Sequence, residues 1–452
     1  MSAQIASRRT ALKGALSASC AFAIARFAWA QGMGVNRTEW YRQAKFGMFI
    51  HWGPYSQASV EASWPIMVPK SGGITESEYR ALAGVFNPTR FDPHAWVDLA
   101  RQAGQKYMVF TTKHHDGFCM FDSAYTDYKI TRTPYGKDIV AQLAQACHED
   151  EMPLGFYYSP PDMHHPGFRD TSKPASDNWH GQPERPEWQS YLSYMQLQLR
   201  ELLTRYGPVA LIWFDGLNDQ EKYDGAHVLR MIGEIQPATL VNDRLGVPGD
   251  YVTPEQFVPA AIPTKDVHFN AVDRSVNKEL KPGVPPPEDF QLWETCMTID
   301  NTWAYNEHDY DFKSPHTLIR SLVEVASRGG NFLLNVGPQP DGQIQPEFQE
   351  RLRAIGVWLT LNGDSIYGTT CGPVQNVEGL RTTAGPKTIY IHLFDWSPPL
   401  CAVSGIDARV LSARLLANGT PLKFRQTEAR LEIEIPPSAP DPDVSVIALN
   451  VF

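Results

Sequence analysis

Polar side chains follow six short apolar runs of the chain, at the point where each run ends. These residues are His51, Lys113-His114-His115-Asp116, Ser159 with Asp162, Asp215, Asn242-Asp243-Arg244 and Glu294. One polar residue in such a place is ordinary, because Asp and Asn also cap helices and form turns. Six of them predict a common site if the runs are parallel strands, whose carboxyl ends meet at one edge of a barrel.

The carboxylates of this set could perform acid–base or nucleophilic chemistry. Glycoside hydrolysis, for example, requires two carboxyl groups flanking the scissile bond. We favour Asp215 as a catalytic group rather than a helix cap, since Trp213 precedes it and Gly216 leaves room for close approach. Sequence spacing does not choose the reacting pair among Asp215, Asp243, Glu255 and Glu294.

The His114-His115-Asp116 triplet could bind either a ligand hydroxyl or a metal ion. Adjacent residues on a strand point to opposite faces, so both imidazoles could reach one ion only beyond the strand end. Hydrogen bonding to a hydroxyl needs less special geometry and is favoured. Arg244 is expected to lie buried beside carboxylates, where it would lower their pKa and favour the ionised form.

Seven apolar runs predict the strands that would carry these residues. They are separated by segments with apolar residues three and four apart, as in the stripes starting at Trp96, Tyr191 and Leu318, which predict helices. The alternation over about 300 residues favours a parallel (β/α) barrel. The expected strands are Phe46–Ile50, Tyr107–Thr111, Leu154–Tyr158, Val209–Phe214, Thr239–Val241, Phe290–Trp293 and Phe332–Val336.

The pattern changes near the C-terminus. Residues 366–452 lose the helical stripes and contain short alternating runs, with Asn418-Gly419 between two of them as a hairpin signal. We therefore expect a catalytic barrel over residues 31–365 and a small antiparallel β-sandwich over residues 366–452. Two domains also agree with the length of 452 residues, which exceeds what one hydrophobic core usually serves.

Composition excludes several classes of function. The formal net charge of −10 argues against a nucleic-acid partner. No GxGxxG or GxxxxGK follows a predicted strand, so no nucleotide cofactor is expected. A pocket of carboxylates, histidines, an arginine and aromatic faces fits a sugar, whose hydroxyls bind polar groups and whose apolar face packs on a ring. The oligomeric state does not follow from the sequence.

The first 30 residues have the features of an export signal. Arg8-Arg9 precedes a short Ala-rich apolar stretch and then Ala28-Trp29-Ala30, which predicts a cleaved Tat-type signal peptide; an amphipathic helix is the alternative. The mature protein is then expected in the periplasm or outside the cell, not in the membrane. It would keep five cysteines without CxxC spacing, most simply buried free thiols, with one disulfide possible.

Seven segments together resemble the retaining α-L-fucosidases, glycoside hydrolase family 29. The resemblance covers nearly the whole mature chain and is strongest between Trp40 and Gly342. The segments are Lys45-Phe46-Gly47-Met48-Phe49-Ile50-His51-Trp52-Gly53, Thr112-Lys113-His114-His115-Asp116-Gly117-Phe118, Phe156-Tyr157-Tyr158-Ser159, Ile212-Trp213-Phe214-Asp215-Gly216, Val241-Asn242-Asp243-Arg244, Trp293-Glu294-Thr295-Cys296-Met297-Thr298 and Ser327-Arg328-Gly329-Gly330-Asn331.

The resemblance implies an α/β fold with a (β/α)8-like TIM barrel, a C-terminal β-sandwich and double-displacement hydrolysis without metal or cofactor. Asp215 matches the family's nucleophile, and Glu255 matches the acid/base of a main branch, with Glu294 as the alternative. The substrate would be a fucosylated glycan or oligosaccharide. The residues that match sugar contacts are His51, Trp64, His114, His115, Tyr158, Trp213 and Arg244.

One segment departs from the family pattern, and two other classes of function stay open. The family commonly has Glu directly before the Trp, whereas this chain has Glu61-Ala62-Ser63-Trp64, and whether Glu61 replaces the missing carboxylate is left open. The first alternative is a metal-dependent hydrolase using His114, His115 and Asp116. The second is a carbohydrate-binding protein without turnover.

Overall fold

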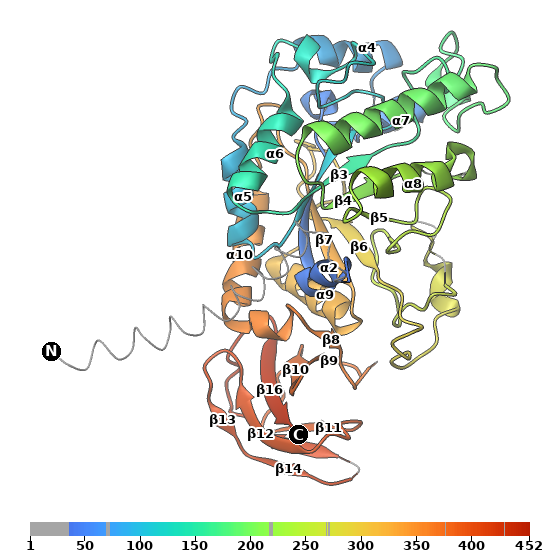
Figure 1. Cartoon of the computed structure of the whole chain (residues 1–452). Coiled ribbons are helices and arrows are strands. Elements are labelled where there is room, and N and C mark those ends of the chain that lie inside the picture. Colours follow the sequence, from blue (N-terminus) through green and yellow to red (C-terminus); the bar gives the residue numbers. More distant parts are fainter. Residues whose placement is uncertain are drawn as a thin grey trace.

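The chain folds into a barrel with a β-sheet layer below it (Figure 1). The computed structural model describes residues 36–68, 73–216, 220–267, 269, 272–375, 377–428 and 430–452. The expected signal peptide, residues 1–30 with Cys20, lies outside the described residues.

Seven strands form the parallel sheet of the barrel, in the spatial order β5-β4-β3-β2-β1-β7-β6. Their bounds confirm six of the seven expected runs to within about three residues at either end. The strands are β1 Phe46–Ile50, β2 Met108–Lys113, β3 Leu154–Tyr158, β4 Leu211–Phe214, β5 Leu240–Val241, β6 Glu294–Thr298 and β7 Asn331–Val336.

The expected strand at Phe290–Trp293 was wrong, because the sheet begins only at Glu294. Residues from Glu294 to Thr298 pair with β7, while Trp293 packs its indole against the backbone of Gly330, where a Cβ would lie 2.3 Å from the ring. Of this run only Trp293 is buried; the three residues before it are partly exposed. Glu294 consequently stands at the start of β6 rather than beyond its carboxyl end.

A short extended segment fills the gap between the two edge strands, β5 and β6. Tyr251 bridges to Asn242 directly after β5, and Val252 and Glu255 bridge to Trp293 and Cys296. The segment thus takes the place of an eighth strand and makes the barrel (β/α)8-like. This pairing places Glu255 in the wall of the barrel.

Helices surround the sheet where the apolar stripes predicted them. Side chains cap three of the main helices: Asp92, Asp138 and Ser314 accept backbone N–H groups of α5, α6 and α9. The main helices are α5 Pro93–Gln102, α6 Ile139–Glu149, α7 Trp188–Arg205, α8 Gly225–Ile235, α9 Pro315–Ser327 and α10 Pro346–Asn362, and the shorter ones are α2 Glu39–Ala44, α3 Trp64–Met67 and α4 Glu76–Ala81.

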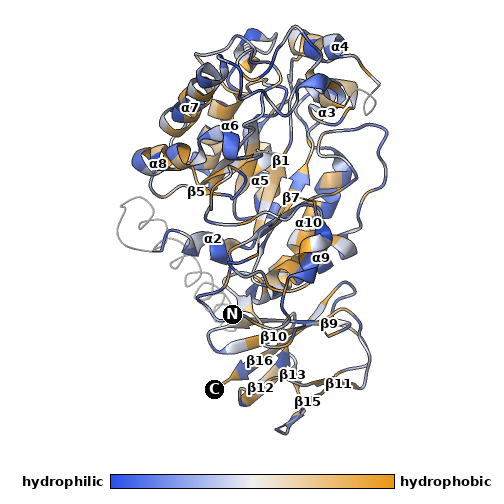
Figure 2. Cartoon of the chain, turned by 90° about the vertical axis from the view of Figure 1, so that its right-hand side faces the viewer, coloured by the Kyte–Doolittle hydropathy of each residue, from blue (hydrophilic) through white to orange (hydrophobic). Residues whose placement is uncertain are grey.

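Alternating strand residues face two different apolar clusters. Phe49, Tyr157 and Trp213 belong to the cluster inside the barrel, whereas Tyr158 and Phe214 belong to the cluster under the helices. Both layers are apolar, so the strands read as continuous hydrophobic runs (Figure 2). The alternation decides which side chains above each strand enter the mouth of the barrel.

The C-terminal region forms two antiparallel sheets, in the orders β13-β12-β16-β10-β9-β8 and β11-β15-β14. The hairpin at Asn418-Gly419 is confirmed, with Gly419 at φ +74° between β12 and β13. The strands are β8 Thr370–Cys371, β9 Leu380–Gly385, β10 Thr388–Leu393, β11 Leu400–Val403, β12 Val410–Leu415, β13 Pro421–Leu422, β14 Phe424–Gln426, β15 Leu431–Glu434 and β16 Ser445–Val451.

Strand β16 joins the two parts of the molecule. Val446 and Ala448 pack into the barrel-side cluster, while Ile447 and Leu449 lie in the core between the two small sheets. The indole N–H of Trp358 on α10 donates to the carbonyl oxygen of Val444 at 2.9 Å. Both faces of this strand are therefore buried.

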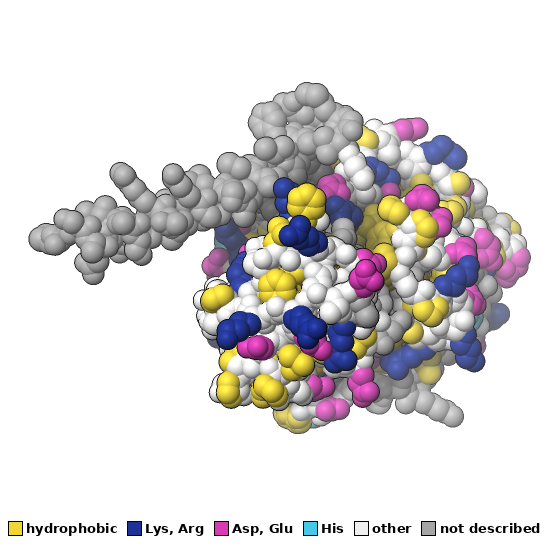
Figure 3. Space-filling view, turned by 90° about the horizontal axis from the view of Figure 1, so that it is seen from below, with side chains coloured by type: hydrophobic (Ala, Val, Ile, Leu, Met, Phe, Trp, Pro, Cys, Tyr) yellow, Lys and Arg dark blue, Asp and Glu magenta, His cyan; other side chains and the backbone are white. Residues whose placement is uncertain are grey.

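Seen from the sandwich side, acidic and basic side chains are interspersed (Figure 3). Among the described residues, none of the helices is long and apolar enough for a membrane span. The expected free thiols are confirmed for Cys119, Cys147, Cys296, Cys371 and Cys401.

A glycine pair tests the packing of the helix layer. A Cβ on Gly356 of α10 would lie 1.8 Å from the carbonyl oxygen of Gln102 at the end of α5. We expect Gly356→Ala to lower the free energy of unfolding by about 2 kcal/mol, because the helices would have to separate. The control Gly233→Ala on α8, where nothing lies within 4 Å, should instead raise it by up to about 1 kcal/mol. Urea unfolding of both variants measures the change in the free energy of unfolding. An equal change in the two variants would contradict the tight packing of α10 on α5.

Candidate active site

Arg244 connects two of the candidate carboxylates. Its Nη1 donates to Oδ1 of Asp215 at 3.2 Å and to Oε2 of Glu255 at 2.9 Å. Its Nε and Nη2 donate to Thr253, at 2.7 Å to the hydroxyl and 2.8 Å to the carbonyl oxygen. The guanidinium lies 4.5 Å above the ring of Trp213, so it is fixed from two sides.

The shared nitrogen limits the separation of the two carboxyl groups. Oxygens that both contact one nitrogen at these distances lie at most about 6 Å apart, below the range of about 6.5–9.5 Å typical of inverting glycosidases. The expected burial of Arg244 beside carboxylates is confirmed, since 5% of the residue is exposed.

The two carboxyl groups differ in their donors and therefore in their pKa. Burial would raise the pKa of Asp215, but a hydrogen bond from His115 and the charges of His115 and Arg244 hold that pKa well below its usual range. Burial raises the pKa of Glu255, and the charge of Asp215 adds to this effect while Arg244 opposes it. The pKa of Asp215 is thus shifted down and that of Glu255 up, although both contact the same guanidinium.

Tyr157, not Tyr158, reaches Asp215. The Tyr157 hydroxyl donates to Oδ2 of Asp215 at 3.0 Å. The expectation for Tyr158 is corrected, because its side chain points outward from β3, where its hydroxyl donates to Gln198 of α7 at 2.8 Å. Side chains of neighbouring strand residues lie on opposite faces of the sheet. Of the two tyrosines, Tyr157 is the one that shares the inner face with Trp213.

Three histidines lie around Asp215 with their Nδ1 atoms engaged. His115 Nε2 is 3.4 Å from Oδ2 of Asp215, and its Nδ1 contacts Ser159 Oγ. His51 Nδ1 lies 2.7 Å from Oδ1 of Asn335, and His114 Nδ1 lies 2.7 Å from Ser63 Oγ. The Nε2 atoms of His51 and His114 are thus available to a ligand, whereas Nε2 of His115 faces Asp215.

The bonding partners fix how each ring presents that nitrogen. An amide oxygen only accepts, so His51 holds its proton on Nδ1 and offers a bare Nε2. Ser63 Oγ also accepts the N–H of Asp116 at 2.8 Å, so this hydroxyl fixes the position of the His114 ring and leaves Nε2 of that ring facing the site. Burial lowers the pKa of His51 to about 4 and that of His114 well below its usual value, which favours neutral rings.

The structure does not assemble the triad His114, His115 and Asp116. Asp116 is turned away, where Oδ2 accepts the Tyr79 hydroxyl at 2.8 Å and Oδ1 the Phe118 N–H at 2.9 Å. In the described part of the chain, Asp215 is the carboxylate whose oxygen lies within 4.8 Å of both imidazoles. That carboxylate is already bonded to the cation Arg244, which disfavours a second cation there.

Glu294 lies deep inside the barrel rather than at its mouth. It is completely buried and accepts the Tyr107 hydroxyl and, at 3.0 Å, the indole N–H of Trp213. Burial raises its pKa to about 7. Its position below Trp213 separates it from Asp215, which disfavours Glu294 as the acid/base and makes it a support for the floor of the site.

In the segment around Trp64, the preceding residue Ser63 is the one that bonds a histidine of the site. Ser63, which directly precedes Trp64, bonds His114, and Trp64 packs against the main apolar core. Glu61 is turned instead to the loop after β6, where it accepts the N–H of Trp303 at 2.9 Å. The Trp303 ring, 5.0 Å from the ring of His51, was not expected from the sequence, where it stands in a polar loop without a strand pattern.

A buried ion pair supports the loop after β3. Lys113 Nζ lies 2.8 Å from Oδ2 of Asp162, and both side chains are essentially unexposed. Oδ1 of Asp162 also accepts the backbone N–H groups of His164 and His165, each at 2.9 Å. Burial would raise the pKa of Asp162, but Lys113 lowers it to about 2.

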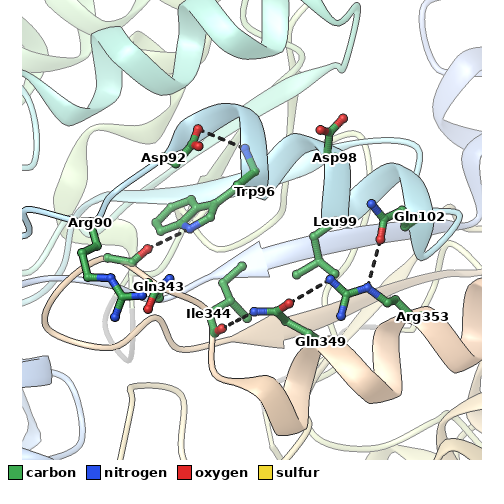
Figure 4. Close-up of a pocket in the computed structure, with 12 residues that line it drawn as sticks. Arg90, Asp92, Trp96, Asp98, Leu99, Gln102, Gln343, Ile344, Gln349 and Arg353 are labelled. Atoms are coloured by element: carbon green, nitrogen blue, oxygen red, sulfur yellow. Dashed lines mark hydrogen bonds between the residues drawn. The ribbon is translucent and has the colours of Figure 1, made fainter.

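A second cleft lies away from these residues, between α5 and the start of α10 (Figure 4). It has a volume of about 400 Å³ and is lined by Trp96, Arg90 and Arg353 among others. Arg353 is bonded to Gln102 at 3.0 Å and to Gln349 at 2.9 Å. The residues that line this cleft include none of the candidate catalytic residues.

Comparisons with known proteins agree on one family. The model of the family described as "Alpha-L-fucosidase" matches residues 24–364. The chain is 30% identical over 423 residues to the plasma alpha-L-fucosidase of Homo sapiens. The aligned region covers 88% of this chain and 85% of the relative.

Solved structures give the same result at the level of the fold. Alpha-L-fucosidase isoenzyme 1 from Paenibacillus thiaminolyticus superposes with a TM-score of 0.81 at 36% identity, over 92% of this chain and 99% of that chain. A GH29 alpha-L-fucosidase from Bacteroides thetaiotaomicron, trapped as a covalent intermediate with 2-fluoro-fucosyl fluoride, superposes with a TM-score of 0.77 at 28% identity, over 92% and 96%.

The Lys113–Asp162 pair predicts an acid-sensitive part of the stability. We expect Asp162→Asn to lower the free energy of unfolding at pH 7 by about 3 kcal/mol, because it leaves a buried ammonium without a counter-charge. Since the folded pKa is below the unfolded value, the carboxylate stabilises above pH 4 and this contribution is lost as the pH falls toward 2.

The deficit of the variant should therefore be smaller at pH 3 than at pH 7. Urea unfolding at both pH values measures it, with Asp341→Asn of the exposed Arg90–Asp341 pair as the control, expected to cost under about 1 kcal/mol. A deficit that is the same at both pH values would contradict the pairing.

Proposed function

The chain belongs to the alpha-L-fucosidase family, glycoside hydrolase family 29, and is a retaining glycoside hydrolase of that activity; we propose that Asp215 is its nucleophile and Glu255 its acid/base. The observation that carries the assignment is the contact of both carboxyl groups with one nitrogen of Arg244. It supports a separation suited to direct attack by one group and proton transfer by the other.

In the first step, a carboxylate oxygen of Asp215 attacks the anomeric carbon of the fucosyl group. The bond from that carbon to the leaving oxygen breaks, and the proton of Glu255 moves to this oxygen. The low pKa of Asp215 keeps the nucleophile ionised, and the raised pKa of Glu255 keeps the proton available. The product is a fucosyl ester of Asp215 and the free aglycone.

In the second step, the ionised Glu255 takes a proton from water, whose oxygen attacks the same carbon. The ester bond to Asp215 breaks and L-fucose leaves with its original anomeric configuration. Arg244 contacts both carboxyl groups and therefore stabilises whichever of them is charged in each step.

The sugar is proposed to lie among the three histidines and the aromatic floor. His51, with its bare Nε2, accepts a hydroxyl proton, and His114 binds a second hydroxyl through its Nε2; His115 lies beside Asp215. Trp213 supports the floor and holds Arg244 above it. Tyr157 takes the place first assigned to Tyr158, and Trp64 remains a proposed contact beside Ser63.

The remaining assignments concern the chain as a whole. We infer that residues 31–365 form the catalytic domain, with residues 366–452 as a sandwich that covers its lower side. Residues 1–30 are proposed as a Tat-type signal that directs the protein to the periplasm or the medium, on the grounds of Arg8-Arg9 and Ala28-Trp29-Ala30. The substrate class is a fucosylated glycan or oligosaccharide.

Turnover of para-nitrophenyl α-L-fucoside tests the two roles. We expect Asp215→Ala to lose at least about 1000-fold in kcat without unfolding, because no covalent step remains. Glu255→Ala should also be slow, but azide should partly restore turnover by attacking the β-fucosyl ester of Asp215, giving an α-fucosyl azide with the configuration of the substrate. Glu294→Ala is the control and should show no azide rescue. Rescue of Glu294→Ala instead of Glu255→Ala would contradict the assignment.

A tyrosine pair tests the face of β3 that enters the site. We expect Tyr157→Phe to lower kcat/KM by about tenfold, because it removes the hydroxyl that donates to Asp215. The matched variant Tyr158→Phe should lower kcat/KM by less than threefold, since its hydroxyl bonds Gln198 under the helices. Steady-state kinetics with the same fucoside measure both variants. A larger loss of kcat/KM in Tyr158→Phe than in Tyr157→Phe would refute the placement of Tyr157 in the site.

A further inference from the structure

The loop between β6 and α9 forms a wall of the site and is held by a buried carboxylate from another loop. Glu61, which follows β1, accepts the backbone N–H of Trp303 with Oε2 at 2.9 Å. Its Oε1 accepts the N–H of Ala62 at 3.2 Å. The carboxylate therefore ties together two loops that lie 242 residues apart in the chain.

The same peptide segment continues the hydrogen-bond path to His51. The carbonyl oxygen of Trp303 accepts Nδ2 of Asn335 at 2.7 Å. This bond orients the amide so that its oxygen faces His51 Nδ1, also at 2.7 Å. Because that oxygen can only accept, His51 keeps its proton on Nδ1 and turns a bare Nε2 to the site.

Packing leaves little freedom in this segment as long as both bonds are present. A Cβ on Gly337, just after β7, would lie 2.5 Å from the backbone nitrogen of Tyr305, so the loop rests on the strand end itself. The ring of Trp303 then lies 5.0 Å from that of His51 and 6.0 Å from that of Phe49. A shift of the loop would move the ring and the Asn335 amide together.

We propose that Glu61 is a positioning residue of the sugar site, which acts through Trp303 and Asn335 on His51. This rests on the proposed role of His51 in binding a fucose hydroxyl. Ser63, the residue beside Trp64, is bonded to His114, so the carboxylate two positions earlier serves the opposite wall of the site. Glu61 supports the geometry without contacting the sugar.

A double-mutant cycle between Glu61 and His51 tests the proposal. We expect Glu61→Ala to raise both KM for the aryl fucoside and Ki for L-fucose about five- to tenfold, with kcat changed less than threefold, because the effect is on binding. In the His51→Ala background, the same substitution should change these constants less than twofold, since its target is absent. Equal effects in both backgrounds would overturn the proposal.

Further variants separate positioning from general destabilisation. Glu61→Gln keeps one oxygen for the Trp303 N–H and should stay within about threefold of the wild type. Glu201→Ala is the matched control: Glu201 is buried and accepts the N–H of Ala124 at 2.9 Å, but it serves a loop outside the barrel and should leave KM and Ki within twofold. If Glu61→Ala does not fold, Glu61→Asp repeats the cycle, because its shorter side chain withdraws the oxygens from Trp303.

A measurement without substrate distinguishes this proposal from the proposed function. The ¹⁵N shifts of the His51 ring report which nitrogen carries the proton. They should show the Nδ1–H form in the wild type and a mixture of both tautomers in Glu61→Ala. An unchanged ring in the variant would refute the positioning role even if turnover of aryl fucosides failed altogether, while failed turnover alone would refute only the proposed function.

Discussion

Arg244 donates from one nitrogen to both Asp215 and Glu255, and the other features of the site follow from this shared contact. The charges of His115 and Arg244 lower the pKa of Asp215, whereas burial raises the pKa of Glu255 against the opposing charge of Arg244. Asp215 receives additional donors from Tyr157 and His115, whereas Arg244 is the donor that the described residues provide to Glu255. The number of donors thus separates the pKa of the proposed nucleophile, Asp215, from that of the proposed acid/base, Glu255.

The barrel provides this arrangement through an interruption of its sheet. Between β5 and β6 the wall is completed by the segment Tyr251–Glu255, which pairs through single bridges rather than a full ladder. Its Thr253 holds the guanidinium of Arg244, and Glu255, two residues further along the segment, accepts from the same guanidinium. The position of Glu255, the proposed acid/base, is therefore coupled to the closure of the barrel, while Asp215, the proposed nucleophile, stands at the end of the regular strand β4.

The fold and most of the site could be predicted because strand periodicity and strand-end chemistry are local properties. Counting by two from Phe49 to His51 and from Trp213 to Asp215 identifies the inner face, and the same count on β3 would have selected Tyr157. The position predicted for Glu294 is wrong because the apolar run before it is not a strand: Trp293 makes a single bridge to Val252, and pairing with β7 begins at Glu294 itself. The roles of Glu61 and Trp303 depend on contacts between distant loops, which no local pattern records.

The central place of β16 has a consequence for the order in which the molecule can form. Its residues, 445–451, lie between β12 and β10 and pack on the barrel and the small sheets at once. During synthesis the barrel strands, all complete by residue 336, have left the ribosome long before this strand exists. The underside of the nascent barrel is then uncovered until residue 451 has emerged, so this surface is a natural place for a chaperone to bind during biogenesis.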